Sequence, residues 1–132
     1  MPRPYATLDH LSIPVADLDA ARRFYDATLA PLGLKIVKEF PDALGYGATH
    51  PVFWLHRANE ARRARPGLGL HLCFGAESRE QVRRFHAAAL AHGARDNGAP
   101  GLRPHYHADY YGAFAFDPEG YKIEAACHAK EA

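Results

Sequence analysis

DPEGYKIE, residues 117–124, joins a tight turn to a segment that carries a carboxylate. Asp-Pro-Glu-Gly is typical of a type I turn, because Asp favours its first position, Pro fixes φ at the second and Gly suits the fourth. The alternation that follows predicts a strand from Tyr121 to Cys127, in which Glu124 shares a face with Lys122. Carboxylates are mostly exposed, so on this stretch alone a solvent-facing Glu124 is the simpler interpretation.

The second half of the chain repeats the first at a spacing of 61 residues. Without a gap, this spacing superposes eight identical pairs: His10 and His71, Leu11 and Leu72, Arg22 and Arg83, Arg23 and Arg84, Phe24 and Phe85, Ala27 and Ala88, Leu29 and Leu90, and Ala30 and Ala91. Such a repeat indicates two copies of one supersecondary unit. It also puts a histidine at the same place in each copy.

Periodicity and turn residues predict the elements of each half. The first half has a strand at 8–15, a helix capped by Asp17 and ended by Gly33, strands at 34–40 and 51–56, and a short strand within 41–47. The second half has a strand at 70–74, a helix from the capping box at 78–81 to about residue 91, an irregular stretch to residue 109, and strands at 110–116 and 121–127. We therefore expect a single α+β domain over 1–132, with module one at 7–58, a linker at 59–68 and module two at 69–128.

Composition excludes several classes of partner. The 132 residues carry a formal net charge of +1, which does not favour nucleic acid or an anionic membrane. No apolar run approaches the roughly 20 residues of a membrane span. The two cysteines, Cys73 and Cys127, lack metal-type spacing and are predicted to be buried free thiols in a reducing, cytoplasmic compartment.

Three motifs together resemble the vicinal oxygen chelate superfamily, which includes glyoxalase I, bleomycin and fosfomycin resistance proteins and extradiol dioxygenases. They are LDHLSIPV at 8–15 with its Asp-capped helix, HLCF at 71–74 and the closing DPEGYKIE. The resemblance implies two βαβββ modules whose paired, curved mixed sheets form a half-barrel. It also implies a homodimer in which a site is shared between chains.

The resemblance implies three metal ligands, at His10, His71 and Glu124. Two imidazoles and one carboxylate form a facial set that leaves positions open on a divalent ion, whether Fe, Mn, Ni, Zn or Co. Those positions accept two oxygens of one small-molecule substrate and polarise them. The alternative for each histidine is an ordinary imidazole with a satisfied hydrogen bond.

A fourth ligand position of the family, which is a glutamate in glyoxalase I, falls on His56. This match aligns residues 53–56 with residues 121–124. His56 is then a fourth ligand, a neutral base or an exposed residue at a strand end. Without the second carboxylate, glyoxalase I activity itself is not expected.

The stretch RPHYHADYY, residues 103–111, concentrates further chemistry. By resemblance to extradiol dioxygenases, His107 or His105 matches an acid–base histidine, and we take His107 as the catalytic candidate beside Glu124. Phe114 stands where those enzymes have a tyrosine, which argues against ring cleavage.

Substrate-binding candidates are His105, Tyr110, Tyr111 and Trp54. For the two tyrosines, a packed lid or a dimer contact is the alternative. Trp54 shares a face with His56 and is a candidate pocket wall, although a core position is equally consistent with its sequence context.

Three functions remain open at this point. The first is a metal-dependent enzyme with isomerase, lyase or dioxygenase chemistry. The second is a metal-free small-molecule binding protein of the bleomycin-resistance type. The third is a dimeric interaction domain without a site, which leaves the placement of Glu124 unexplained.

Overall fold

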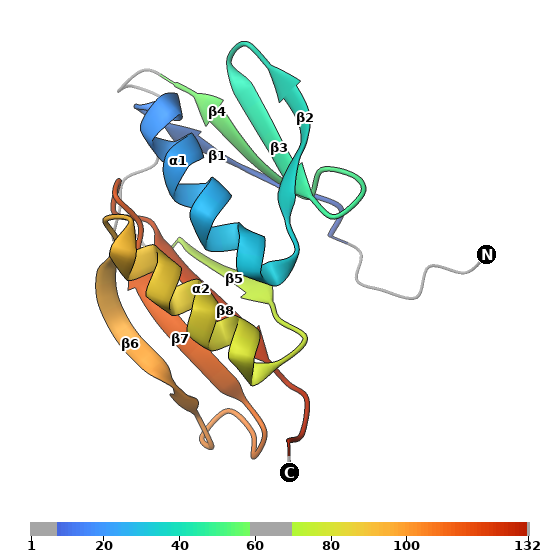
Figure 1. The fold of residues 1–132 in the computed structure, drawn as a ribbon, viewed down its shortest axis with the longest axis vertical. Coiled ribbons are helices and arrows are strands. Elements are labelled where there is room, and N and C mark those ends of the chain that lie inside the picture. The colour runs from blue at the N-terminus through green and yellow to red at the C-terminus, as the bar shows by residue number, and fades with distance from the viewer. Residues whose placement is uncertain (1–7, 59–69, 132) are drawn as a thin grey trace, which may run out of the picture.

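The computed structural model describes residues 8–58 and 70–131, and it contains the predicted repeat. Module one consists of β1 (Leu11–Val15), α1 (Leu18–Leu29), the 3-10 turn η1 (Ala30–Leu32), β2 (Lys35–Phe40), β3 (Ala43–Gly47) and β4 (Phe53–Arg57). Module two consists of β5 (His71–Gly75), α2 (Arg79–Ala91), β6 (Arg95–Leu102), β7 (Tyr111–Phe116) and β8 (Lys122–Cys127). The predicted α+β architecture is confirmed (Figure 1).

Each module folds into one four-stranded mixed sheet with the same strand order. The orders are β1-β4-β3-β2 and β5-β8-β7-β6, and the two sheets are not closed into a barrel. In each sheet the first and last strands of the module run parallel and lie side by side. This arrangement brings β8, with Glu124, next to β5, with His71.

Both helices begin at the predicted caps. The Asp17 side chain accepts a hydrogen bond from the Ala20 N–H, and the Ser78 side chain accepts one from the Gln81 N–H. At the end of η1, Gly33 adopts a left-handed φ of 80°, which suits a glycine C-cap. Because the capping residues lie 61 positions apart, the sequence repeat is also a structural repeat.

One strand was not predicted, and the largest shift in a predicted strand boundary is at the start of β1. β6 occupies Arg95–Leu102, inside the stretch predicted to be irregular. It is an edge strand that bonds only to β7, and its register shifts around Gly98, where φ is 150°. Proline and glycine are tolerated at such an edge, so composition hid the strand. β1 begins at Leu11 rather than Leu8, which leaves His10 just ahead of the strand.

The hydrophobic core lies between the helices and one face of each sheet. On β8 the side chains of Ile123, Ala125 and Cys127 belong to this core and are fully buried. Both helices cover the sheets on the same side of the molecule, as Figure 1 shows, and the helices contact one another. The opposite faces of both sheets are therefore directed to one common side.

The DPEG turn fixes module two to module one. Both oxygens of the Glu119 carboxylate accept hydrogen bonds from the Ala16 and Asp17 N–H groups at the start of α1, at 2.9–3.1 Å. The Tyr25 hydroxyl of α1 donates to the Asp117 carboxylate at 2.6 Å. The turn therefore sets the relative placement of the modules, besides leading into β8.

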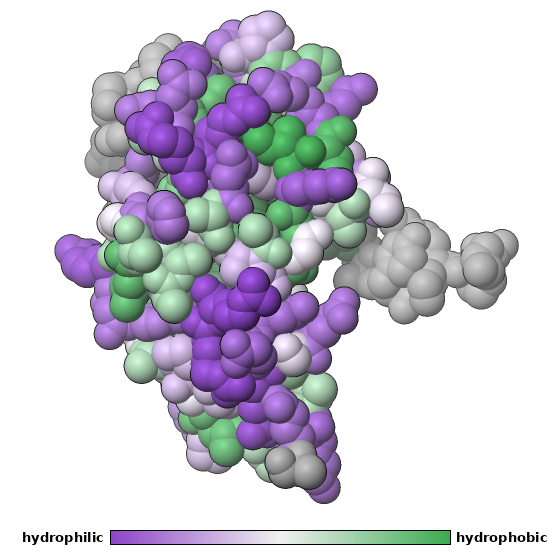
Figure 2. Space-filling view, viewed as in Figure 1, coloured by the Kyte–Doolittle hydropathy of each residue, from purple (hydrophilic) through white to green (hydrophobic). Residues whose placement is uncertain are grey.

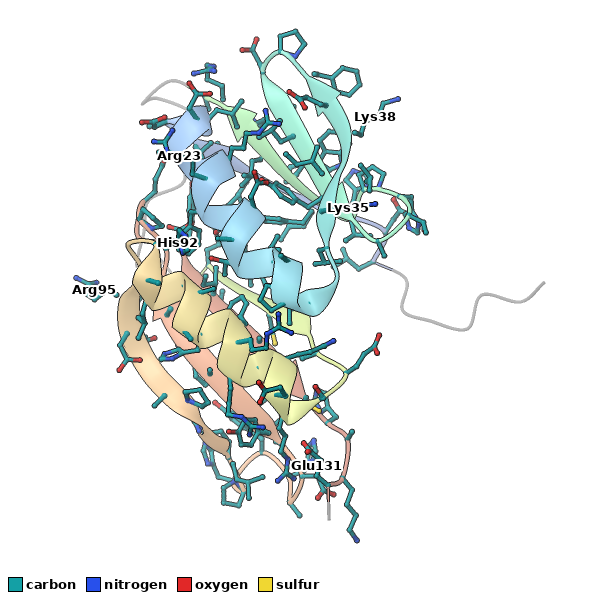
Figure 3. The ribbon with its side chains drawn as sticks, viewed as in Figure 1. Arg23, Lys35, Lys38, His92, Arg95 and Glu131 are labelled. Atoms are coloured by element: carbon teal, nitrogen blue, oxygen red, sulfur yellow. The ribbon has the colours of Figure 1, made fainter. Side chains whose placement is uncertain are left out.

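The outer surface over α2 is mixed. Figure 2 shows hydrophilic residues over the first part of α2 and weakly hydrophobic ones toward its C-terminal end. Arg23, Lys38 and Arg95 extend away from the body of the protein (Figure 3). None of the described helices is both long enough and apolar enough to cross a membrane. The predicted linker at 59–68 falls outside the described residues.

Candidate functional site

Glu124 is buried in the middle of β8, with only 2% of its surface exposed. Its side chain lies on the face that the helices do not cover, because its neighbours Ile123 and Ala125 face the core. One carboxylate oxygen, Oε1, lies 2.9 Å from Nε2 of His71. The other, Oε2, accepts a hydrogen bond from the Tyr110 hydroxyl. A carboxylate is unfavourable in such a position unless polar partners compensate it, and here both oxygens have one.

Gly112 makes the space for this arrangement. A Cβ atom at position 112 would lie 3.0 Å from Glu124 Oε2 and 3.1 Å from a Tyr110 ring carbon. Both distances are shorter than ordinary van der Waals contact. A larger residue would push the carboxylate away from Tyr110.

A pocket of about 420 Å³ opens over Glu124. It is lined by His71, Tyr106, His107, Tyr110, Glu124 and His128. Nε2 of His107 lies 2.9 Å from Nδ1 of His128, and the Asp109 N–H donates to Nδ1 of His107 at 3.2 Å. Since Nδ1 of His107 accepts the hydrogen bond from Asp109, neutral His107 carries its proton on Nε2 and donates a hydrogen bond from Nε2 to Nδ1 of His128. Neutral His128 then carries its own proton on Nε2.

Two proton donors, Cys73 and Tyr110, lie beside the carboxylate. Cys73 as a residue is exposed, but desolvation of its sulfur and the neighbouring Glu124 raise the pKa of the thiol to about 12. Burial, followed by the hydrogen bond to Glu124, also raises the pKa of Tyr110. Both groups therefore remain protonated at neutral pH and present O–H or S–H hydrogens.

The sequence prediction for the cysteines was half right. Cys127 is buried, whereas Cys73 is exposed on β5, directly opposite Glu124 in the sheet register. Cys73 lies on the open face of the sheet because it has the same strand parity as His71.

The corresponding face of module one carries a larger cavity, of about 640 Å³. His10, Trp54 and His56 contribute to its lining. His10 is exposed, and its Nδ1 lies 2.8 Å from the Asp9 carboxylate. The structure therefore places the predicted ligands in two groups, with His71 and Glu124 on module two and His10 and His56 on module one.

A divalent ion fits the donors of module two in part. Two ligands at right angles around an ion with bonds of about 2.1 Å stand about 3 Å apart. The 2.9 Å between His71 Nε2 and Glu124 Oε1 matches that spacing. Within the described part of one chain, however, no three His, Cys, Asp or Glu side chains form a group that could hold an ion. The complete three-ligand set stays a prediction.

The sheet register corrects the sequence alignment of the fourth position. Ser12 of β1 is opposite Trp54, and the repeat-equivalent Cys73 of β5 is opposite Glu124. The structural counterpart of Glu124 is therefore Trp54, and the alignment of His56 with Glu124 was wrong. The alignment was two residues out of register, because it paired position 56 with position 124 whereas the strand pairing relates position 54 to position 124.

The other predicted side chains lie in different surroundings. His107 and Tyr110 line the pocket over Glu124. Tyr111 points to the helix side of β7, where its hydroxyl is 3.3 Å from Arg83, so within one chain it does not line the pocket. His105 packs against Tyr106, with ring centroids 4.3 Å apart.

Two contacts in the pocket were not predicted from the sequence. Tyr110, a predicted substrate-binding residue, donates its hydroxyl hydrogen to Glu124 from the position before β7. His128, which the sequence analysis does not single out, pairs with His107. The sequence could have indicated this contact, because His128 directly follows β8, the strand of Glu124, and residues at a strand end lie near the side chains of adjacent strands.

Comparisons with known proteins agree with this architecture. The sequence profile of the Glyoxalase/Bleomycin resistance protein/Dioxygenase superfamily matches residues 7–125. The uncharacterized protein YqjT of Bacillus subtilis (strain 168) is 30% identical, over 89% of this chain and 95% of its own length. A crystal structure of a glyoxalase/bleomycin resistance protein from Albidiferax ferrireducens T118 superposes with a TM-score of 0.82 at 32% identity, covering 92% of this chain and 99% of that one.

A more distant structure shows the same fold. The fosfomycin resistance protein FosX from Mesorhizobium loti superposes with a TM-score of 0.67 at 13% identity, covering 95% of this chain and 94% of its own. At that identity the likeness concerns architecture alone.

Proposed function

We propose that this chain, which belongs to the glyoxalase/bleomycin resistance protein/dioxygenase superfamily, is a divalent-metal-dependent enzyme that binds a small substrate through two adjacent oxygens. The observation that carries the proposal is the buried Glu124 carboxylate, which lies between His71 and Tyr110 on the open face of its sheet. A residue that served only the fold would not require a charge at the base of a pocket.

His71 and Glu124 would hold the ion, together with His10 of a second copy of the chain. The repeat supports this third ligand, because His10 and His71 are equivalent residues on equivalent faces. One described chain does not assemble three ligands, so the proposal includes a homodimer. When bound, the ion would act as a Lewis acid toward the two substrate oxygens.

The protein's own groups would then orient the substrate and handle its protons. Tyr110 holds Oε2 of Glu124 and so fixes the direction of Oε1. His107 lies in the same pocket and is the proposed acid–base group. The Asp109 N–H fixes its tautomer, and its Nε2 proton would pass to or from the substrate through His128, to which it is hydrogen-bonded. This set suits lyase, isomerase or dioxygenase chemistry on a substrate that must gain or lose a proton.

A specific observation also favours a second candidate, a metal-free binding protein. The contact between His71 and Glu124 satisfies both groups without an ion. The cavities would then hold a small molecule by shape and stacking alone.

Metal binding by wild type, Glu124→Gln and Glu80→Gln separates the two candidates. Glu80 is the matched control, because it is an exposed carboxylate whose partner is Arg83. Each protein is purified without chelator, analysed for metal, and titrated with Fe(II), Mn(II), Ni(II), Zn(II) and Co(II) by calorimetry.

Wild type and Glu80→Gln are expected to bind about one ion per chain. Changing a residue that hydrogen-bonds a metal ligand typically lowers metal affinity roughly 10–100-fold. Glu124→Gln removes a proposed ligand itself, so it should lower metal affinity by more than this. Equal affinity in all three proteins, or no binding of any of these ions by wild type, would reject the enzyme proposal in favour of the binding protein.

A further inference from the structure

The two modules carry chemically different side chains at one structurally equivalent position. Trp54 is opposite Ser12 on module one, and Glu124 is opposite Cys73 on module two. Ser12 and Cys73 are separated by the spacing of the repeat, 61 residues. An indole therefore occupies the place in module one that a carboxylate occupies in module two.

The indole of Trp54 is held in a defined orientation. A Cβ atom at Gly45 would lie 2.9 Å from the indole Cη2 atom, so the ring passes directly over that glycine. Phe40 packs against the indole as well, with ring centroids 6.0 Å apart and planes 23° apart. Trp54 is only partly buried, so a ring surface is both fixed and accessible.

This ring lines the same cavity as His10. If His10 is a ligand to the proposed ion, a molecule chelated on that ion extends into a space of about 640 Å³ beside the indole. The acid in the described lining, Asp9, already contacts His10 at 2.8 Å. Beside the chelating position, the lining combines the apolar side chains of Phe40, Ala43, Pro51 and Trp54 with the polar Ser12, His50 and His56, and most of its area is apolar.

We infer that the substrate carries its two adjacent oxygens on a flat, apolar body, and that Trp54 positions this body by stacking. The inference rests on the proposed function, because it takes His10 as a metal ligand. It assigns the halves of the site different tasks: the face of module two binds charge, and the face of module one recognises shape.

Two chelators of equal denticity test the inference. Tropolone and acetohydroxamate each bind an ion through two adjacent oxygens, but only tropolone has a flat ring. Their affinities for Co(II)-loaded homodimer are measured by calorimetry for wild type, Trp54→Leu, Trp54→Phe and Phe40→Leu. Phe40 is 50% exposed, so its replacement loosens the stack without opening the core.

We expect Trp54→Leu to weaken tropolone about tenfold, which corresponds to about 1.4 kcal/mol, and to leave acetohydroxamate within about twofold of wild type. Trp54→Phe should restore most of the tropolone affinity, because a flat ring returns. Phe40→Leu should give a smaller loss, again for tropolone alone.

Equal losses for both chelators, or no loss for either, would overturn the inference while leaving metal binding in place. Failure of both chelators to bind wild type in a metal-dependent way would instead overturn the proposed function, and the inference with it.

Discussion

Replacing Gly112 by alanine tests the packing on which the pocket depends. Gly112 and Gly75 both lie in strands of module two, and neither adopts a positive φ. At Gly75 a new Cβ would have no heavy atom within 4 Å. At Gly112 it would approach Glu124 Oε2 to 3.0 Å and the Tyr110 ring to 3.1 Å. Gly75→Ala is therefore a control in the same kind of strand backbone, at an exposed position where the methyl group meets nothing, whereas Gly112 is buried.

The expected magnitudes follow from two opposing terms. Each substitution restricts the unfolded chain and thereby stabilises the protein by about 0.4–1 kcal/mol. At Gly112 this gain is opposed by overpacking, which costs about 1–3 kcal/mol. Glu124 is 2% exposed and both of its oxygens are engaged, so it cannot move aside easily. Gly112→Ala should be less stable than Gly75→Ala by roughly 1–3 kcal/mol.

Urea unfolding followed by circular dichroism measures the difference. With a slope of about 2 kcal/mol/M, in the middle of the usual range, the midpoint for Gly112→Ala should fall roughly 0.5–1.5 M below that for Gly75→Ala. Equal midpoints would refute the reasoning, since they would mean that the carboxylate and Tyr110 can relax freely. A loss at Gly75 alone would refute it more strongly.

Three other predictions address neighbouring contacts. Tyr110→Phe removes the hydrogen-bond donor to Glu124 and should weaken metal binding, measured by calorimetry, by roughly 10–100-fold. Tyr106→Phe, at a residue that is 57% exposed, should leave the metal affinity unchanged. Equal effects of the two substitutions would remove Tyr110 from the site. Glu119→Ala removes the acceptor for the Ala16 and Asp17 N–H groups just ahead of α1. It should lower stability in urea by about 0.5–1.5 kcal/mol, unlike Glu80→Ala, and an unchanged midpoint would contradict that role. Burial raises the pKa of Asp117 above its usual 3.8, so ionisation of this carboxyl group opposes folding. Wild type should therefore gain stability relative to Asp117→Asn as the pH falls through the folded-state pKa toward 3.8. Unfolding curves at several pH values that show a constant or opposite difference would contradict the assignment.

The fold could be predicted because its signals are local and repeated. Asp17 and Ser78 cap their helices as the sequence predicts, and the spacing of 61 residues relates the modules in both sequence and structure. β6 could not be predicted in the same way. Its Gly98 and Pro100 are tolerated only because the strand is at an edge, and edge position is a property of the assembled sheet.

The site could be predicted only for residues whose neighbours are fixed by a single strand pair. His71 and Glu124 meet because β5 and β8 lie side by side. The counterpart of Glu124 in module one depends on the register between β1 and β4, which the sequence does not encode in any short motif. For that reason the sequence predicted Trp54 only as a candidate wall of the pocket, and it assigned the counterpart position of Glu124 to His56. Tyr110 was similarly hidden, because its reach to Glu124 depends on how the chain enters β7.

Mixing two inactive homodimers tests the central proposal most directly. His10→Ala and Glu124→Gln each remove one proposed ligand from every site, so neither homodimer alone should bind the ion with wild-type affinity. After subunit exchange, each mixed dimer would combine an intact His10 with an intact His71 and Glu124 at one of its two sites. An equimolar mixture should therefore recover roughly one quarter of the wild-type high-affinity capacity. A mixture that binds no more metal than its separate components would contradict a site shared between two chains.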